Sequence, residues 1–329
     1  MKTENMPENI KGNIPLKDYS TFKMGGAAKY FCTVKNEEET KAALDFAITK
    51  QLRVFVIGRG SNLLISDDGF DGLVLKIEDS SVKSEATKDG VVLNLGAGNL
   101  LTKLALDFQK ESIGGLEWTA GIPATLGGAI CSNAGANGKE ISESVREVRA
   151  LEMELAPEKY LESYALRSIK KDECAFAYRK SLFKDTKKFI ILGATLFLSR
   201  GDSDKAKKEI EKNLENRRQK QPIEYPNAGS TFKNPVLSEE QKDKLSQKCP
   251  HFADVCKNST VPAGWLIEQA GLKGKKIGGV MVSEKHANFI VNTGEGKAED
   301  VVILISLIKQ KIRIKFSIQL HEEIEYVGF

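Results

Sequence analysis

The sequence predicts an α+β protein composed of two or three modules. Its 329 residues exceed what one ordinary hydrophobic core organises, and its 41% hydrophobic and 29% charged residues are typical of a globular chain. A glycine loop at residues 58–62 follows a short apolar strand but leads into more strand and turn. A Rossmann dinucleotide loop opens directly into a helix, whose N-terminus holds the pyrophosphate. The loop therefore lacks the Rossmann context.

The elements flanking this loop follow from local patterns. Asn36 and Glu39 indicate a helix N-cap with its capping-box partner. After that helix we expect a strand at residues 54–57, and strand and turn over residues 63–75. The helix face expected to be buried consists of Ala43, Leu44, Ala47 and Ile48.

Residues 114–138 have the highest density of glycine in the chain. Pro123 suits the first position of a short helix, where its missing N–H costs nothing. Gly127 and Gly128 within that helix would let another backbone or a ligand approach closely.

The remaining elements surround a linker at residues 201–204, where we place the main domain boundary. A helix rich in lysine and glutamate follows the linker and ends near Gln221. The other expected elements are strands at 91–95, 145–151, 189–198 and 317–327, and helices at 101–110 and from about Ala298.

Composition excludes several classes of protein. The longest apolar run, Val301 to Ile308, is far shorter than the ~20 residues that span a bilayer, and the N-terminus has no apolar core typical of a secretory signal. We therefore expect a cytoplasmic protein. The five cysteines form no CxxC pair and the three histidines are scattered, so we expect neither a disulfide framework nor a metal site. The net charge of +4 is a mild bias that suits an anionic small molecule.

The two glycine-rich stretches are the first candidate site. Backbone N–H groups in such turns, and at a helix start, bind phosphate, and two loops suit a pyrophosphate. The alternative is that these glycines mark tight turns in a compact domain. No GxxxxGK[ST] motif occurs, which argues against a P-loop hydrolase.

Two further side chains suit chemistry on a carbanion. Ser230, on a Gly-Ser turn next to a lysine and an asparagine, could donate a proton to an enolate, although the residues alone favour an ordinary turn hydroxyl. Arg179 suits bidentate pairing with a carboxylate and would stabilise an adjacent enolate, although a surface basic run is the alternative. The basic stretch at 216–221 lacks interleaved aromatic residues, so we interpret it as a solvated helix face or a small-anion site.

The C-terminal strand raises a choice between two glutamates. With a period of two, Glu322 shares a face with apolar residues, whereas Glu323 lies on a polar face. Periodicity alone therefore marks Glu322 as the unusual carboxylate. The two expected faces are Ile318, Leu320, Glu322, Ile324 and Tyr326, and Gln319, His321, Glu323, Glu325 and Val327.

Several short motifs follow one another along most of the chain. They are Tyr19–Phe22 with Gly25-Gly26, Ile57–Leu64, Gly121–Ala129, Asn133–Ala136, Tyr178-Arg179, Gly229–Pro235, Ala263–Ile267 and Ser283–Phe289. In this order and spacing, they resemble the UDP-N-acetylenolpyruvoylglucosamine reductases (the MurB family) of peptidoglycan synthesis. The chain is similar to the shorter subtype, which lacks an inserted tyrosine loop.

The resemblance implies an FAD-binding module of the vanillyl-alcohol-oxidase (PCMH) type, with subdomains at about 1–80 and 81–200. It implies a substrate domain at 201–329 whose last strand returns toward the flavin. The implied activity is reduction of UDP-N-acetylglucosamine enolpyruvate to UDP-N-acetylmuramate, with bound FAD and with NADPH as co-substrate.

The resemblance also implies roles for single residues. Arg179 and Glu323 would stabilise the enolate and Ser230 would protonate it; the family pattern Leu-Glu-x-Glu, aligned on Leu320, selects Glu323 and leaves His321 in place of the first glutamate. Substrate contacts are expected from Tyr178, Arg217, Lys220 and Asn234. FAD contacts are expected from Gly58, Arg59, Gly60, Ser61, Asn62, Leu63, Gly121, Ile122, Pro123, Ala124, Thr125, Gly127, Gly128 and Ala129.

Two other functions stay open from the sequence. One is another FAD-linked oxidoreductase of the same fold, acting on a hydroxy acid or an alcohol. The other is a non-catalytic nucleotide-binding or nucleic-acid-binding protein. For the reductase we expect only small-molecule partners, the UDP-sugar and NADPH, and no nucleic acid, membrane or obligate protein partner.

Overall fold

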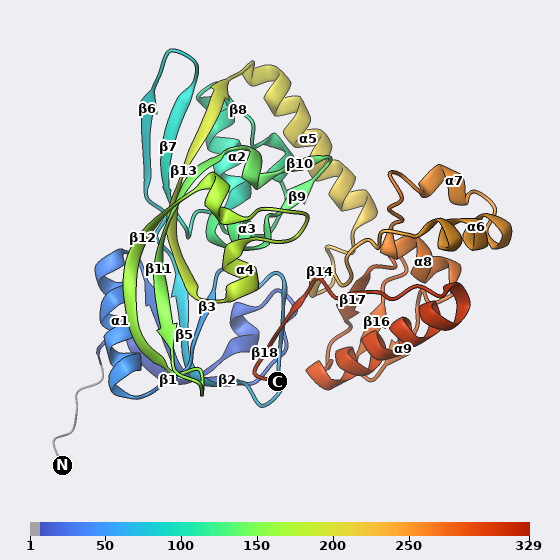
Figure 1. Ribbon diagram of the computed structural model, residues 1–329, viewed down its shortest axis with the longest axis horizontal. Helices are drawn as coiled ribbons and strands as arrows, with labels where there is room; N and C mark the ends of the chain where they lie inside the picture. Colours follow the sequence, from blue (N-terminus) through green and yellow to red (C-terminus); the bar gives the residue numbers. More distant parts are fainter. Residues whose placement is uncertain (1–6) are drawn as a thin grey trace. The chain divides into compact units, whose positions relative to one another are not determined.

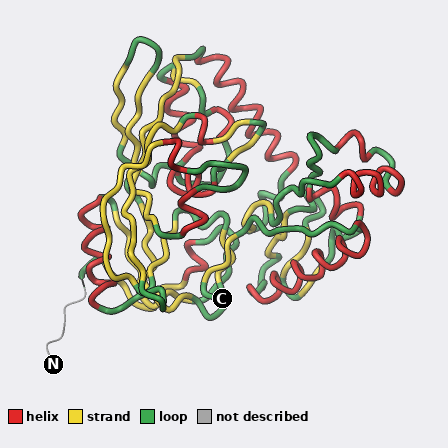
Figure 2. The backbone as a smooth tube through the Cα atoms, in the orientation of Figure 1, coloured by secondary structure: helices red, strands yellow, loops and turns green. Residues whose placement is uncertain are grey.

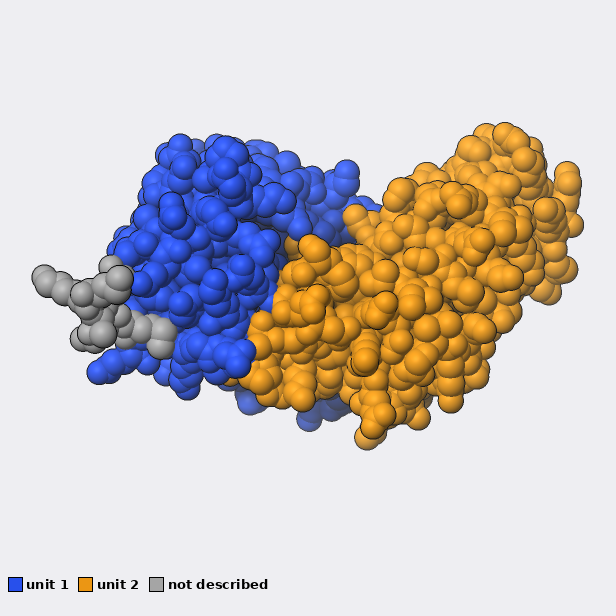
Figure 3. Space-filling view, turned by 90° about the horizontal axis from the view of Figure 1, so that it is seen from below, with its two compact units in different colours: residues 1–14, 28–59, 70–217 blue, residues 15–27, 60–69, 218–329 orange. Residues whose placement is uncertain are grey.

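The protein, represented by a computed structural model, is described over residues 7–329 and forms two compact units. Unit 1 contains the described residues up to Ile14, then Ala28–Arg59 and Phe70–Arg217. Unit 2 contains Pro15–Ala27, Gly60–Gly69 and Arg218–Phe329. Figure 3 shows unit 1 in blue and unit 2 in orange, and Figure 2 shows that strands predominate in the first and helices in the second. No helix within residues 7–329 has the length and apolar character needed to cross a membrane.

A four-stranded sheet begins unit 1. The strands at residues 27–34 and 54–57 both run parallel to the strand between them at residues 70–77, and helix α1 (Glu37–Thr49) connects the first to the second. The predicted N-cap of α1 is confirmed, because Asn36 accepts the Glu39 N–H at 2.8 Å. The Glu39 carboxylate accepts the N–H of Lys35 at 2.8 Å, and not that of Asn36 as a capping box requires. Three of the four predicted face residues are buried and Ile48 is partly buried. In spatial order the strands are β1 (Ile10–Pro15), β2 (Ala27–Val34), β5 (Phe70–Ile77) and β3 (Val54–Ile57).

The second sheet of unit 1 is antiparallel, and its strands are shown in cyan to yellow-green in Figure 1. The three strands predicted within it are confirmed. Sequence analysis did not predict β6, whose residues are all exposed and leave no apolar face. In order, the strands are β12 (Leu161–Lys170), β11 (Val145–Leu155), β13 (Phe189–Arg200), β7 (Val91–Gly96) and β6 (Val82–Ala86), with β8 (Ile113–Gly114) on the end of β13.

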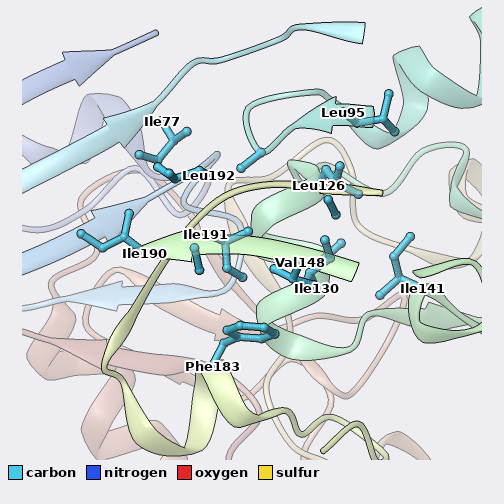
Figure 4. Close-up of a cluster of buried hydrophobic side chains, with 14 of the residues drawn as sticks. Ile77, Leu95, Leu126, Ile130, Ile141, Val148, Phe183, Ile190, Ile191 and Leu192 are labelled. Carbon is cyan, nitrogen blue, oxygen red and sulfur yellow. The ribbon is translucent and has the colours of Figure 1, made fainter. Parts of the chain in front are cut away.

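Apolar side chains from this sheet and from α3 (Leu126–Ser132) pack together in the core of unit 1 (Figure 4). Helix α2 (Leu101–Lys110) has the predicted bounds and buries Leu101, Leu104 and Phe108. The smaller elements of this unit are β9 (Gly135–Ala136), β10 (Lys139–Glu140), α4 (Leu182–Thr186), and 3-10 turns at Glu117–Thr119, Ile141–Glu143 and Lys171–Cys174.

The predicted helix start at Pro123 is wrong. Helix α3 begins at Leu126, and its N-cap is Thr125, whose hydroxyl accepts the Gly128 N–H at 3.3 Å. Residues 124 and 126 pair with the chain at 99–101, through Leu101 N–H to the Ala124 carbonyl at 3.1 Å. This pairing keeps the chain extended past Pro123, so the helix starts three residues later.

The long helix α5 (Ser203–Lys220) belongs to unit 1 as far as Arg217. It packs there through the buried side chains of Ala206, Ile210 and Asn213, and the Asn213 amide donates to the Glu117 carbonyl at 3.0 Å. The compact units therefore divide near Arg217, which differs from the expected boundary at the 201–204 linker, and unit 2 also includes two N-terminal segments.

Unit 2 is a small antiparallel sheet covered by helices. The predicted helix from Ala298 is confirmed as α9 (Ala298–Phe316), and the Asp67 carboxylate caps it by accepting the Ala298 N–H at 3.1 Å. The sheet consists of β14 (Asn227–Ser230), β17 (Phe289–Asn292), β16 (Val280–Val282) and β15 (Lys276–Ile277). The other elements are a 3-10 turn at Leu16–Tyr19, α6 (Glu239–Lys248), α7 (Phe252–Val255) and α8 (Ala263–Gln269).

The predicted C-terminal strand at 317–327 is wrong over most of its length. Only β18 (Glu325–Val327) forms a ladder, parallel to β4 (Leu63–Ile65). The residues before it alternate in burial as a strand would, with Ile318, Leu320 and Ile324 buried. They follow the core of unit 2, but their only bridge joins Glu322 to Phe232, so burial periodicity there reflects packing rather than a ladder.

Candidate active site

The two glycine-rich stretches meet within unit 1. A Cβ on Gly58 would overlap the Thr125 hydroxyl, so glycine is required for this approach. Gly127 donates its N–H to the Ala97 carbonyl at 2.9 Å, and a Cβ there would lie 2.9 Å from the Ala97 Cβ. The predicted close approach at Gly127 is therefore made by the protein's own backbone. At exposed Gly128 a Cβ would meet only the Thr125 hydroxyl, at 3.5 Å, which leaves room for a ligand.

The available backbone donors lie in the first loop rather than at the helix start. The first N–H groups of α3 are engaged, as Leu126 donates to Asn99 at 2.8 Å and Gly128 donates to Thr125 at 3.3 Å. Among the described residues, the five consecutive N–H groups of Gly58 to Asn62 donate to no protein acceptor. A glycine loop with consecutive unengaged N–H groups fits a phosphate or pyrophosphate ligand.

A second motif supports the first loop from within unit 2. Gly60 has a φ of +62°, and a Cβ on it would overlap the Tyr19 carbonyl. The Thr21 N–H donates to the Gly60 carbonyl at 3.2 Å, and the Thr21 hydroxyl donates to the Asn227 carbonyl at 2.7 Å. The N-terminal Tyr-Ser-Thr motif thus joins the glycine loop to strand β14.

Arg179 lies at the tip of a tight turn in unit 1. Ala177 and Lys180 close this turn with reciprocal backbone bonds of 3.2 and 2.9 Å, and Arg179 adopts a left-handed φ of +57°. Its guanidinium donates to the Gly135 carbonyl at 2.9 Å and lies 5.1 Å from the ring centroid of exposed Tyr178. The structure therefore anchors this arginine against the glycine-containing segment at 133–138.

Ser230 and Glu323 lie on neighbouring segments of unit 2. Ser230 ends strand β14 and pairs with Phe289, directly after Gly229 with a φ of +75°. The Glu323 N–H donates to the Thr231 carbonyl at 2.8 Å, and the Glu323 carbonyl accepts the Asn62 amide at 3.1 Å. Both side chains are half-buried. These backbone bonds place Glu323 next to Thr231, the residue that follows Ser230 in the chain.

Glu322 has a different environment. Its carboxylate forms a salt bridge to Lys309 of α9 at 2.8 Å, with both side chains about one quarter to one third exposed. Glu322 is therefore engaged by α9, whereas the backbone of Glu323 is bonded to Thr231 and Asn62.

The residues predicted to contact substrate are distributed over both units. In unit 1 half-buried Arg217 packs along Gly121, where a Cβ would lie 2.6 Å from the arginine Cδ; burial lowers the pKa of Arg217. In unit 2 Lys220 is exposed, and the Asn234 side chain accepts the Ala263 N–H at 2.9 Å at the start of α8. One function of Asn234 is thus to cap a helix.

Sequence analysis assigned no role to Asn288, although it lies in one of the quoted motifs. Its side chain accepts the Phe232 N–H at 3.0 Å and donates to the Phe232 carbonyl at 2.8 Å. The partner is 56 residues away, so no local pattern could have indicated this pair.

Comparison with known proteins supports an FAD-binding module followed by a C-terminal reductase domain. The FAD binding domain family model matches residues 28–155, and the model for the UDP-N-acetylenolpyruvoylglucosamine reductase C-terminal domain matches residues 221–327. A UDP-N-acetylenolpyruvoylglucosamine reductase of Lachnoclostridium phytofermentans is 37% identical over 98% of this chain and 94% of its own length. One from a Synechococcus strain is 38% identical over 97% of this chain and 91% of its own.

A solved structure extends the similarity to the fold. The crystal structure of UDP-N-acetylenolpyruvylglucosamine reductase from Thermus caldophilus matches with a TM-score of 0.71 and 28% identity, covering 97% of this chain and 99% of that one. The predicted α+β fold, with an FAD-binding module and a separate C-terminal domain, is confirmed. The chain belongs to the UDP-N-acetylenolpyruvoylglucosamine reductase family.

Proposed function

We propose that this protein is an FAD-dependent reductase that uses NADPH to convert UDP-N-acetylglucosamine enolpyruvate to UDP-N-acetylmuramate. The observation that supports it best is the 2.8 Å bond from the Glu323 N–H to the carbonyl of Thr231, the residue that follows the proposed proton donor Ser230. We further propose that the protein acts in the cytoplasm on small molecules, without nucleic acid, membrane or an obligate protein partner.

The residues of the first glycine loop fit the FAD that the family requires. The unengaged N–H groups of Gly58 to Asn62 would bind its pyrophosphate, and the open space at Gly128 would admit part of the cofactor. When bound, FAD supplies hydride transfer between NADPH and the substrate. The protein contributes binding, orientation and charge.

The substrate half of the reaction then sets clear physical requirements. Hydride addition to the vinyl methylene carbon leaves a carbanion next to the substrate carboxylate, delocalised as an enolate. The guanidinium of Arg179 would stabilise this charge, and Glu323 would act with it as a hydrogen-bonding acid. The hydroxyl of Ser230 would donate the proton that completes the reaction.

A spectrum of the purified protein tests the proposed activity. We expect a yellow protein that releases FAD rather than FMN on heating. Under anaerobic conditions NADPH should bleach the flavin absorbance, and the enolpyruvyl UDP-sugar should restore it. A colourless, folded protein obtained with cofactor in excess would contradict the proposal, and reoxidation by a hydroxy acid's ketone product instead would favour a different FAD-linked oxidoreductase.

Exchange of Gly128 for alanine tests the position of the cofactor separately from folding. The new methyl group would contact only Thr125, and alanine is favoured over glycine within a helix by about 0.5–1 kcal/mol. We expect the FAD-free Gly128→Ala protein to melt at or above the wild-type temperature while binding FAD more weakly in fluorescence titration.

Gly58→Ala serves as the contrasting variant, because its methyl group would overlap the Thr125 hydroxyl. We expect this change to lower the melting temperature of the FAD-free protein as well as its FAD affinity. Unchanged FAD affinity in Gly128→Ala would show that the cofactor does not approach this helix.

A further inference from the structure

Asn288 lies where the ladder between β14 and β17 stops. The last pair of that ladder is Ser230 with Phe289. Beyond it, the Asn288 side chain pairs with both backbone groups of Phe232, accepting its N–H at 3.0 Å and donating to its carbonyl at 2.8 Å. The Asn288 carbonyl also accepts the Thr231 N–H at 2.7 Å. The amide therefore replaces a neighbouring strand for Phe232, while the Asn288 backbone carbonyl pairs with Thr231.

The opposite edge of the same segment holds the C-terminal glutamates. Thr231 accepts the Glu323 N–H at 2.8 Å, and the Lys233 N–H donates to the His321 carbonyl at 2.9 Å. Residues 231–233 are thus paired on one edge with Asn288 and on the other with residues 321–323. Ser230 is joined covalently to this segment, and Glu323 is joined by a hydrogen bond.

Asn288 is itself held in place. It is 4% exposed, and its N–H donates to the Nδ1 atom of His286 at 3.2 Å. Burial lowers the pKa of His286, which keeps the ring neutral and this nitrogen available as an acceptor. Gly264 packs against the pair, since a Cβ on it would lie 3.2 Å from His286 and 3.4 Å from Asn288. The amide thus has one defined position.

We propose that Asn288 is a positioning residue for protonation of the substrate: its side-chain amide fixes the segment through which Ser230 and Glu323 are held in register. The proposal rests on the proposed roles of Ser230 and Glu323. Asn288 acts through the backbone of residues 231 and 232. A displacement of about 1 Å in a reacting group costs on the order of 10²-fold in rate, so loss of this amide should be visible in kinetics.

The first test is Asn288→Leu, which keeps the size of the side chain and removes both hydrogen bonds. We expect reoxidation of reduced FAD by the enolpyruvyl substrate to slow by about 10–100-fold, while reduction of FAD by NADPH stays within about twofold of wild type. Stopped-flow absorbance measures both steps in the holoenzyme. Equal slowing of both steps, or no slowing of reoxidation, would overturn the proposal.

Asn292→Leu is the matched control. Asn292 is 3% exposed and lies in β17, and its side chain donates to Phe22 at 3.1 Å and accepts from Gly294 and Gly296 at 3.0 and 3.1 Å. These bonds are as extensive as those of Asn288 but do not reach residues 230–232. We expect Asn292→Leu to lower the melting temperature without selective loss of reoxidation. A selective loss in this variant too would mean that the effect comes from lower stability.

Asn288→Asp keeps the test decisive if the leucine variant does not fold. An ionised aspartate cannot donate to the Phe232 carbonyl, whereas a protonated one restores both bonds. The ratio of its reoxidation rate to that of wild type should therefore rise as the pH falls. A ratio that does not change with pH would contradict a hydrogen-bonding role for the amide.

Combination with Ser230→Ala separates the proposed role of Asn288 from that of Ser230. If Asn288 acts through Ser230, Asn288→Asp should slow reoxidation much less in the Ser230→Ala background than in wild type. If Ser230→Ala alone slows both half-reactions equally, the proposed function of Ser230 fails. If Ser230→Ala is selective but the two changes are additive, only the role of Asn288 fails.

Discussion

Ser230→Ala is expected to slow reoxidation of reduced FAD by the enolpyruvyl substrate by about 10²–10⁴-fold, the usual cost of losing a general acid. Reduction of FAD by NADPH should stay near the wild-type rate, because that hydride transfer needs no proton from this hydroxyl. Stopped-flow absorbance of the two half-reactions, measured separately, gives both rates from one preparation.

Ser238→Ala is the appropriate control for a lost hydroxyl. Ser238 lies in the same unit, and its hydroxyl caps α6 by accepting the Gln241 N–H at 3.3 Å. Its loss should lower the melting temperature without separating the half-reactions. If Ser230→Ala slowed both half-reactions to the same extent, Ser230 would be structural and its assignment as proton donor would be wrong.

Glu323→Gln is expected to reduce substrate-driven reoxidation by a similar factor, about 10²–10⁴-fold. Glutamine preserves the volume and removes the charge and the titratable proton. The main-chain bonds of this residue to Thr231 and Asn62 do not depend on its side chain, so FAD reduction by NADPH and the melting temperature should stay close to wild type.

Glu322→Gln should have the opposite profile. This change weakens the salt bridge to Lys309, a partly exposed pair worth at most about 1 kcal/mol. We expect a small decrease in melting temperature and a reoxidation rate near that of wild type. An inactive Glu322→Gln enzyme together with an active Glu323→Gln enzyme would show that the register between residues 231–233 and 321–323 does not serve catalysis as proposed.

Elements with complete local signals were predictable from the sequence. The capping pair Asn36 and Glu39 lies within one helical turn, and the apolar positions of α2 repeat at helical spacing, so both helices begin where the sequence indicates. The absence of a helix after Gly60 was also predictable, because residues 63–75 have the composition of strand and turn. Each of these signals spans fewer than fifteen residues.

Elements that depend on a distant partner were not predictable from the sequence. The start of α3 at Leu126 depends on pairing with residues 99–101, which overrides the local preference of Pro123 for a first helical position. The C-terminal segment has the apolar alternation of a strand, but a ladder also needs an adjacent strand, and only β4 at residues 63–65 provides one, for the last three strand residues. Periodicity predicts which side chains are buried and does not predict what they pair with.

The sequence by itself determined the glycine-rich motifs, the exclusion of a Rossmann loop, and the family that the ordered motifs resemble. Its alternation marks Glu322 as the carboxylate on the apolar face, but it does not show what either glutamate contacts. Only the tertiary structure assigns their environments: Lys309 engages Glu322, and the Thr231 backbone holds Glu323. The two glutamates are adjacent in the chain, so their different environments come from distant residues that only folding brings into contact. Lys309 lies 13 residues from Glu322, and Thr231 lies about 90 residues from Glu323.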